Sequence, residues 1–550
     1  MTTLYNVLGI DLGTTNSVAT VYTDEGLEHI SFDNDFLLPS VVNISDNGVI
    51  VGAKAKNMAM IASENTAISV KRLMGGSDVI ALNNKKFTPQ EISSFIIKKI
   101  VESASSQMGK KFTECVVTVP AYFNEKQREA TREAVLLAEL EPIRIINEPT
   151  AAAISYGADK HKDMVYAVYD LGGGTFDISI IENSQGLIEV VSTTGDNSLG
   201  GDDFDKKLAD LILEKSDLNL EMTTSLKIKL LQLAQDVKVQ LSKEDEVIVD
   251  EKFFAKVDGV AKHLELTVTK EEFETLIEED IDRTVALLEE AVEESGYDMD
   301  EIESIVLTGG SSKIPFIAQK ILEQTQKLPI LIEDPDKSVS IGAILQAAMI
   351  KGIDTESILI DITPYSLGTM VREDDGSLVL SKIIFKNSPV PSSKTSRYYA
   401  GVPYQEAYEL TVYQGEDEDD LSNDVKIGSM LFELESPVEE GEIDITFNLD
   451  QNGMLSVTGS EVSTGEKVQG MFKTTITKST NHKKIAQMSI LNEHENSIVM
   501  KIDELLSNKD VLDEDKSDLK TLKTKYLSAS DSEKEDIEEE IIDIIFFLEQ

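Results

Sequence analysis

The chain has 550 residues, more than one hydrophobic core supports, so we expect two to four domains. It carries 100 acidic and 51 basic residues, and its formal net charge is -49. This balance excludes nucleic-acid binding as the main role, because binding through phosphates depends on clustered lysine and arginine.

The first residues run directly into a strand pattern without a basic region, so we expect no signal peptide. No apolar stretch approaches the roughly 20 residues that a membrane helix needs. The single cysteine, Cys115, excludes an internal disulfide and is expected in a core. The five histidines are scattered and show no metal spacing. We therefore expect a cytoplasmic protein with no nucleic-acid or membrane partner.

Strand-like and helix-like patterns alternate over residues 1–352, which is typical of an α/β domain. For example, the run at 114–123 predicts a strand, and the run at 125–140 predicts an amphipathic helix. A short apolar stretch at 353–361 is expected to link this domain to the rest of the chain.

The second half of the chain has two different patterns. Alternating runs separated by turn signals predict a β-sandwich at 362–478. Residues 479–550 are rich in Glu, Lys and Leu and contain no proline, which predicts two or three amphipathic helices.

An internal repeat links two places in the α/β domain. Residues 5–16 and 165–177 each read as an apolar strand, then Asp-Leu-Gly, then small hydroxyl or glycine residues. Two such units predict two similar lobes that face each other, each offering a turn to a shared ligand. Glycine-rich runs at 199–205 and 305–315 are weak signals by themselves.

The chemistry of the repeated turns favours a phosphate held with a metal. Glycines let backbone N–H groups approach an anion closely, and the hydroxyls of Thr14, Thr15 and Thr175 add donors. The turns also carry Asp11, Asp170 and Asp177, which would repel a phosphate unless a hard cation lay between them; Mg²⁺ held through water fits. One such motif alone could equally be a tight turn with a capping aspartate, but two at matching strand ends favour a ligand.

Six segments occur in the order and approximate spacing of the seventy-kilodalton heat-shock chaperones: GIDLGTTNS, VTVPAYFNEKQREATREA, RIINEPTAAAISYG, DLGGGTFDISI, LGGDDFD and IVLTGGSSKIP. The chain resembles this DnaK-type family strongly over 4–352, through SILIDITPYSLG, moderately over the β region, and weakly after 480. The short segment between Gly76 and Phe87 and the short carboxyl end look most similar to the HscC branch of bacterial DnaK paralogues. The resemblance implies an actin-like ATPase domain with a duplicated RNase H-like fold, a β-sandwich peptide-binding domain and a short helical lid.

The resemblance also implies roles for individual residues of the ATPase domain. Those that would hold phosphates are Thr14, Thr15, Gly172, Gly173, Gly174 and Thr175. Asp11, Asp170 and Asp177 would order Mg²⁺ and the attacking water, Glu148 would hold water or metal, and Lys71 would stabilise the transferring γ-phosphate. Those on the adenosine side would be Gly200, Gly201, Lys238, Ser242, Gly309, Gly310 and Asp336.

Further roles implied by the resemblance concern communication and client binding. Pro120 and Arg128 would transmit the nucleotide state, and Arg144 and Asp361 would engage a J-domain partner. The coupling segment would be Ile358, Leu359, Ile360 and Asp361. The peptide groove would be lined by Thr369, Val371, Tyr398, Gly401, Tyr408 and Leu410, where Tyr408 replaces a small aliphatic residue.

Three adenosine-side positions depart from the family pattern. Gln235 stands for the usual glutamate, Val239 for a frequent arginine, and Lys313 for an arginine that packs on adenine. Lysine has no planar guanidinium to stack on the base, so we expect weaker nucleotide binding.

The resulting expectation is an ATP-dependent chaperone and ATP hydrolase. It implies ATP or ADP with Mg²⁺, K⁺ as a further candidate ion, polypeptide clients and a J-domain co-chaperone, with the need for an exchange factor left open. The alternatives are a small-molecule kinase or a filament-forming protein of the actin-like superfamily. A kinase would leave the β region without a role, and nucleotide-dependent sedimentation would indicate a filament.

Overall fold

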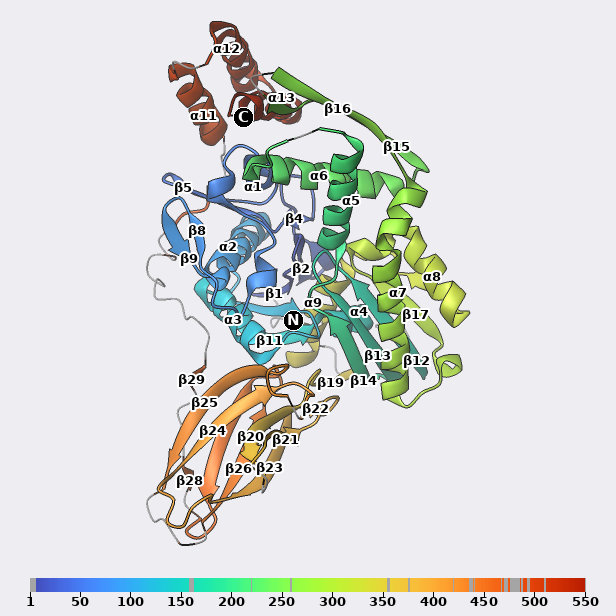
Figure 1. Ribbon diagram of the computed structural model, residues 1–550, viewed down its shortest axis with the longest axis vertical. Coiled ribbons are helices and arrows are strands. Elements are labelled where there is room, and N and C mark those ends of the chain that lie inside the picture. Colours follow the sequence, from blue (N-terminus) through green and yellow to red (C-terminus); the bar gives the residue numbers. More distant parts are fainter. Residues whose placement is uncertain are drawn as a thin grey trace.

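A computed structural model gives the structure of the chain (Figure 1). It describes residues 6–157, 163–218, 220–257, 260–353, 357–373, 376–418, 420–434, 439, 441–465, 467–468, 473–474, 485, 488–491, 495–508 and 511–549. Among these residues, no helix is both long and apolar enough to cross a membrane.

The first lobe is built on a six-stranded sheet in which the first repeated segment forms the central β1–β2 hairpin. The strand order is β11-β10-β1-β2-β3, and β4 pairs with β2. β1 runs antiparallel to β2 and parallel to β10, which runs parallel to β11. The strands are β1 (Val7–Asp11), β2 (Asn16–Thr23), β3 (Gly26–His29), β4 (Leu38–Pro39), β10 (Glu114–Val119) and β11 (Glu141–Asn147).

The second lobe repeats this plan. β12 pairs antiparallel with β13 and parallel with β17, so β14-β13-β12-β17-β18 matches β3-β2-β1-β10-β11 in strand direction. The two repeated sequence segments therefore occupy equivalent hairpins, as the repeat predicted. The strands are β12 (Met164–Leu171), β13 (Phe176–Ser184), β14 (Leu187–Asp196), β17 (Ser304–Thr308), β18 (Ile330–Leu331), β19 (Ile358–Ile362) and β22 (Pro389–Val390).

Helices and small sheets complete the first lobe. α2 begins with a capping box in which Thr88 and Glu91 bind each other's backbone N–H groups, and Pro89 follows the cap. The shortened segment after Gly76 forms only the β8–β9 hairpin. The elements are α1 (Ala53–Met58), α2 (Pro89–Met108), α3 (Glu125–Leu137), α4 (Glu148–Gly157), β5 (Val42–Ser45), β6 (Gly48–Val51), β7 (Thr66–Ala67), β8 (Ile80–Leu82), β9 (Lys85–Phe87) and 3₁₀ turns at Ser63–Asn65 and Val70–Leu73.

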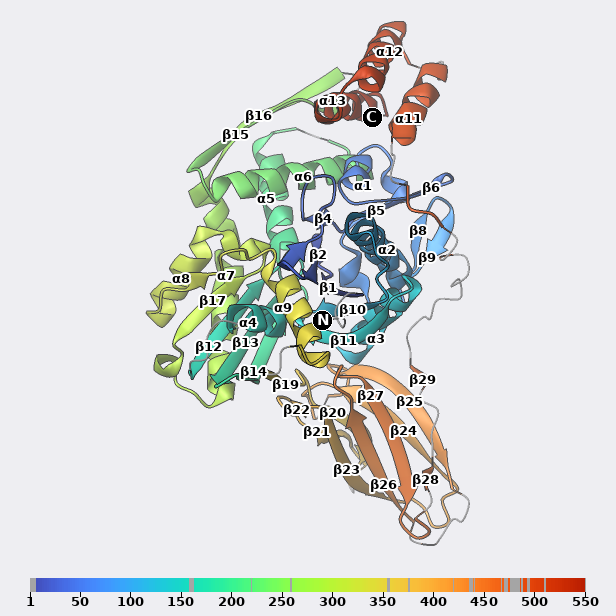
Figure 2. The same ribbon diagram turned by 180° about the vertical axis from the view of Figure 1, so that it is seen from behind.

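In the second lobe α7 packs on the sheet, against β13 and β14, α6 packs on α5 and β15, and α9 reaches across to β1 and β10 of the first lobe. A long two-stranded hairpin stands beside these helices (Figures 1 and 2). α7 starts at a Thr269–Glu272 capping box and ends at Gly296 with φ 78°. The elements are α5 (Gly201–Lys215), α6 (Thr224–Leu241), α7 (Lys270–Ser295), α8 (Pro315–Thr325), α9 (Ser338–Ile350), β15 (Glu246–Val257), β16 (Val260–Thr269) and 3₁₀ turns at Met299–Glu301 and Gly310–Lys313.

The two lobes meet where α4 and α9 cross. A Cβ atom on Gly342 would lie 1.8 Å from the backbone oxygen of Ala151. Only glycine allows the two helix backbones to approach so closely, which places the lobes side by side with their hairpins facing.

The β domain is a two-sheet sandwich at one end of the molecule (Figure 1). One sheet has the order β21-β20-β24-β25-β29 and the other β23-β26-β27-β28. Their facing residues form one core that includes Phe432 and Phe447. The strands are β20 (Leu367–Arg372), β21 (Leu378–Ile384), β23 (Ser392–Tyr399), β24 (Ala407–Gln414), β25 (Val425–Glu433), β26 (Glu442–Leu449), β27 (Leu455–Glu461), β28 (Lys467–Val468) and β29 (Lys473–Thr474).

Three helices end the chain: α11 (Glu495–Ser507), α12 (Asp513–Ser528) and α13 (Asp531–Glu549). They lie at the end of the molecule opposite the β domain (Figures 1 and 2). In this structure they do not cover the sandwich as the word lid implies. The reason is that their buried side chains, such as Ile502 and Ile545, join the hydrophobic core of the second lobe.

Candidate functional site

A cleft of about 800 Å³ lies between the lobes, and both repeated turns line it. The turns touch, because a Cβ atom on Gly173 would lie 2.0 Å from Thr15 Oγ1. The expected phosphate-site residues on the cleft surface are Thr14, Thr15, Gly172, Gly173 and Thr175. Gly174 is packed behind this surface, where a Cβ would lie 2.7 Å from Thr14 Oγ1. The repeat therefore brings both hydroxyl-glycine turns to one cleft.

Three carboxylates, those of Asp11, Glu148 and Asp170, lie on the floor of this cleft, and the carboxylate of Asp177 is buried behind them. Asp11 ends β1 and accepts a hydrogen bond from Thr118 Oγ1 at 3.0 Å. Asp170 and Asp177 lie opposite each other on β12 and β13. Asp177 accepts a hydrogen bond from the Tyr122 N–H at 3.0 Å, and Glu148 begins α4. The strand ends and one helix start thus place four acidic groups together.

The crowding of these acids shifts their ionisation. Burial and the charge of Glu148 raise the pKa of Asp11 to about 7 and the pKa of Asp177 to about 8. Burial and Glu148 also raise the pKa of Asp170. A site with this much unfavourable negative charge is suited to a bound cation.

Lys71 is the cation that faces these acids. It comes from the 3₁₀ turn Val70–Leu73, is buried, and lies 2.5 Å from Glu148 Oε1 through its Nζ. As a lone lysine it would be expected on the surface, and only the motif VKRLMGG pointed to it. The structure places it on the cleft wall beside the carboxylates.

The arrangement fits a magnesium ion held through water. Within the described part of the chain, no three His, Cys, Asp or Glu side chains converge closely enough to bind one metal directly. The side chains of Asp11 and Asp170 instead line the cleft, where water molecules can lie between them and the metal ion. Water-mediated binding suits Mg²⁺, which gives up its water reluctantly.

The residues expected to contact adenosine line the same cleft, on the side formed by α6 and the turn after β17. Lys238 Nζ contacts Asp205 Oδ1 at 2.7 Å and donates to the Gly201 backbone oxygen at 3.1 Å. Gly309 has a φ of 82° and would place a Cβ 2.5 Å from Asp170 Oδ1, so it joins this region to the acidic floor. The expected residues that line the cleft here are Lys238, Ser242, Gly309, Gly310 and Asp336, while Gly200 and Gly201 pack against Gly173 behind them.

Comparison with known proteins identifies this architecture. A family model described as Hsp70 protein matches residues 7–81 and 76–545. The chain belongs to the Hsp70 family. The chaperone protein dnaK of Cyanidium caldarium is 38% identical to it over 494 residues, covering 84% of this chain and 79% of that protein. Like other Hsp70 proteins, the chain is an ATP-dependent chaperone and an ATPase that uses ATP or ADP with Mg²⁺.

Sequence reasoning missed Arg72, which joins the lobes of this Hsp70 protein at the cleft. Its guanidinium donates to both carboxylate oxygens of Asp203, at 3.1 and 2.5 Å, from the opposite lobe. Asp202 beside it accepts from Ser69 Oγ at 2.8 Å. The available signal was the position of Arg72 next to Lys71 and of two acids after Gly201.

The three departures from the Hsp70 pattern have different surroundings. Gln235 Oε1 accepts a hydrogen bond from Lys56 Nζ of the first lobe at 2.9 Å. The Val239 side chain is largely exposed. Lys313 forms an ion pair with Asp336. Gln235 therefore contributes to the contact between the lobes as well as to the cleft wall.

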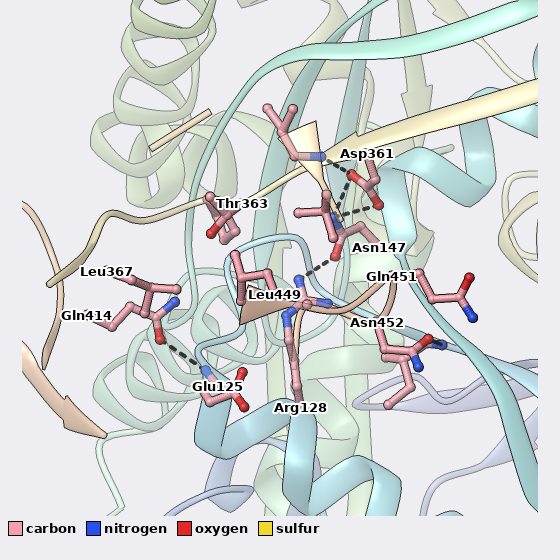
Figure 3. A pocket seen from close by; sticks show the side chains of 15 residues that line it. Glu125, Arg128, Asn147, Asp361, Thr363, Leu367, Gln414, Leu449, Gln451 and Asn452 are labelled. Carbon is pink, nitrogen blue, oxygen red and sulfur yellow. Dashed lines mark hydrogen bonds between the residues drawn. The ribbon is translucent and has the colours of Figure 1, made fainter. Parts of the chain in front are cut away.

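Arg128, expected to transmit the nucleotide state, and Asp361, expected to engage a J-domain, lie in one buried cluster joined by Asn147, which the sequence did not single out (Figure 3). Arg128 donates to Asn147 Oδ1 at 2.5 Å, and Asn147 donates to both carboxylate oxygens of Asp361 at 3.1 Å. Arg144 is also buried, and its positive charge lies close enough to Asp361 to oppose the rise in the pKa of Asp361 that burial causes. Pro120 is buried at the end of β10, and its backbone oxygen accepts the Phe123 N–H.

The expected coupling segment connects the second lobe with the β domain. Ile358, Leu359 and Ile360 pair in parallel with β14 of the lobe. Asp361 and Ile362, on the same strand, pair with β22, which follows β21 of the β domain in the chain and contributes Val390 to the sandwich core. One strand thus belongs to both parts of the molecule.

The expected groove residues differ in exposure. Leu410 and Thr369 are buried, and Val371 and Tyr398 are half-buried. Gly401 is exposed, and its N–H donates to Gln405 Oε1. Tyr408 packs its ring against the sandwich core, and its buried hydroxyl has no hydrogen-bond partner in the described part of the chain.

Proposed function

We propose that the cleft of this Hsp70 protein hydrolyses ATP and that the nucleotide state controls a peptide groove in the β domain. The observation that carries the coupling is the shared strand β19, which pairs with β14 of the second lobe and with β22 of the β domain. Its Asp361 lies in the buried cluster with Asn147, Arg128 and Arg144. A movement of the second lobe would therefore be transmitted through β19 to the β domain.

The cleft residues have complementary roles in the proposed hydrolysis. Asp177, fixed by the Tyr122 N–H, orients the attacking water. Lys71 carries a fixed positive charge to the transferring phosphate, where charge develops. A bound Mg²⁺ would neutralise phosphate oxygens, and Asp11 and Asp170 would hold it through water. Glu148 holds Lys71 in place and orders water beside it.

The finer identity of the protein is part of the same proposal. The β8–β9 hairpin is all that follows Gly76 before α2, which supports an HscC-like member of the family. We further propose that K⁺ binds beside the phosphates and that the clients are unfolded or specific polypeptides. Arg144 and Asp361 are buried in this arrangement, so we propose that they engage a J-domain partner in the cytoplasm once the β domain undocks.

The test of the proposed function is the ATP hydrolysis rate of the full chain with and without an unfolded peptide and a J-domain. We expect each addition to raise the rate and both together to raise it most. A rate that neither addition changes would argue against coupling between groove and cleft.

The groove itself offers a prediction about client choice. Tyr408→Val removes a ring that fills space against the core, so affinity for a leucine-rich peptide should rise by about tenfold, since one changed pocket group is worth ~1–3 kcal/mol. Fluorescence anisotropy with a labelled peptide measures it. Tyr408→Phe is the matched control, because it keeps the ring and should not gain affinity for leucine. Tight binding of such peptides by the unaltered protein would refute this account of the groove.

A further inference from the structure

A glutamate at the start of α3 is buried where the β domain meets the first lobe. Glu125 is 8% exposed and directly follows Asn124, which caps the helix. Its backbone N–H donates to the side-chain oxygen of Gln414 on β24 at 3.0 Å. Its Oε1 accepts a hydrogen bond from the Leu455 N–H of β27 at 2.9 Å. Both partners belong to the β domain, so the surroundings of this carboxyl group depend on whether the β domain is docked.

A small cavity lies in the same interface (Figure 3). Its volume of about 20 Å³ has room for about one water molecule. Glu125 lines the cavity from the first lobe, and Gln414 and Gln451 line it from the β domain. Thr363 and Gln451 carry oxygen atoms that can accept a proton from a carboxylic acid, directly or through one water. The interface therefore has a place for a neutral, protonated Glu125.

The charged groups around Glu125 do not neutralise its carboxylate. Arg128, one turn further along α3, donates to three neutral oxygens of the first lobe. Glu129 of the same helix and Asp450 of the turn before β27 add negative charge nearby. Burial raises the pKa of Glu125 to about 8, against the opposing effects of the Leu455 N–H and Arg128. Glu125 is therefore mostly protonated at neutral pH while the β domain is docked.

Asp361, the other buried acid of this interface, has more support for its negative charge. Its two carboxylate oxygens both accept from the Asn147 amide at 3.1 Å. Arg144 and Arg128 both act against the rise in its pKa that burial causes. Glu125 has one backbone donor and one opposing guanidinium, so it is the acid that docking neutralises more readily.

Undocking would return the same carboxyl group to water in the first turn of a helix. The amino-terminal end of a helix stabilises a negative side chain, and water replaces the Leu455 N–H there. The pKa of Glu125 should then lie near its ordinary value of 4.5. The group is thus a carboxylate when undocked and an acid when docked over the range between these two values.

We propose that docking of the β domain on the first lobe takes up one proton at Glu125, so that a fall in pH stabilises the docked arrangement. The proposal rests on the proposed function only in that the β domain docks and undocks, and it adds a regulator of that step. Between about pH 4.5 and 8 the docking constant should fall about tenfold for each unit of rising pH, because only the docked state holds the proton. Above this range both states carry the carboxylate and the dependence ends.

The experiment measures docking in the full chain by energy transfer between two dyes. Leu328→Cys on the second lobe and Val402→Cys on the β domain provide labelling sites, because these side chains are 71% and 59% exposed. The native Cys115 is buried and should not react. Transfer is followed from about pH 5.5 to 8.5 with saturating ATP and, separately, with ADP. We expect the docking constant of the unaltered sequence to fall as the pH rises.

Glu125→Gln keeps the shape of the side chain without a charge, so it should stay docked across the same range. Glu129→Gln is the matched control, because it removes an acid one turn away and should keep the pH dependence. Infrared difference spectra at pH 7 between the unaltered protein and Glu125→Gln should show a protonated carboxyl band even if docking is complete. Glu125→Ala serves if the glutamine variant fails to fold.

The outcomes separate this proposal from the proposed function. Identical pH profiles for the unaltered protein and Glu125→Gln, or an infrared difference that contains only a carboxylate, would overturn proton uptake at Glu125. Low transfer in both proteins at every pH would instead overturn the docked arrangement and the coupling that depends on it.

Discussion

Asp177→Asn is expected to lower the single-turnover rate of ATP hydrolysis by at least about a hundredfold, the scale of losing one preorganised polar group at a reacting centre. The Asp177 carboxylate is 1% exposed, is held by the Tyr122 N–H and lies behind the acids that line the cleft. Asparagine keeps the shape but cannot accept a proton or orient water through two equivalent oxygens. Nucleotide binding should persist, because Asp177 is packed behind the residues that line the cleft.

The measurement is a rapid-quench single turnover with ATP bound before the reaction starts. Asp250→Asn is the matched control, since this aspartate is half exposed on the β15–β16 hairpin away from the acidic floor. Lys71→Ala should cause a loss of similar size, because it leaves Glu148 and its neighbours without their facing cation. Hydrolysis by either variant at the rate of the unaltered protein would remove that residue from the mechanism.

Asp361→Ala is expected to abolish stimulation of ATP hydrolysis by peptide while the basal rate persists. Asp361 is 5% exposed and faces Arg128 and Arg144, which are 6% and 7% exposed. Removing it leaves the buried Asn147 amide without its acceptor, which costs about 1–3 kcal/mol, and takes a nearby negative charge away from the two buried guanidinium groups. The variant therefore destabilises the state in which the β domain is docked, since these groups return to water when it undocks.

The matched control for this prediction is Asp444→Ala. Asp444 pairs with the guanidinium of Arg397, but the pair is exposed on the sandwich and is worth at most about 1 kcal/mol. This control should keep full stimulation in the same steady-state assay. Persistence of stimulation in the Asp361 variant would show that the buried cluster does not carry the coupling.

The elements that local pattern encodes were predictable from sequence. The apolar runs before each Asp-Leu-Gly predicted the strands β1 and β12, and the helix predicted from residue 125 begins there. The helical pattern at 125–140 ends earlier, at Leu137, because Glu139 adopts a φ of 62° and turns the chain into β11. The β-sandwich and the helical end followed from periodicity alone in the same way.

The contacts that could not be predicted from hydrophobic periodicity or local motifs join residues far apart in the chain. Lys71 meets Glu148 across 77 positions, and Arg72 meets Asp203 across 131. A single sequence holds no periodic signal for such pairs, so Arg72 was missed and Lys71 was found only through a family motif. The position of α13 has the same cause, because its amphipathic pattern shows that a face is buried but not against which partner.

The central claim is tested most directly by the release of a labelled unfolded peptide from the ADP-bound protein after ATP is added with Mg²⁺. Fluorescence anisotropy follows the release rate. The account predicts that ATP accelerates release strongly, and that Lys71→Ala, which should bind ATP without hydrolysing it, does so as well. A release rate that ATP leaves unchanged, in a protein that demonstrably binds both ATP and peptide, would contradict it.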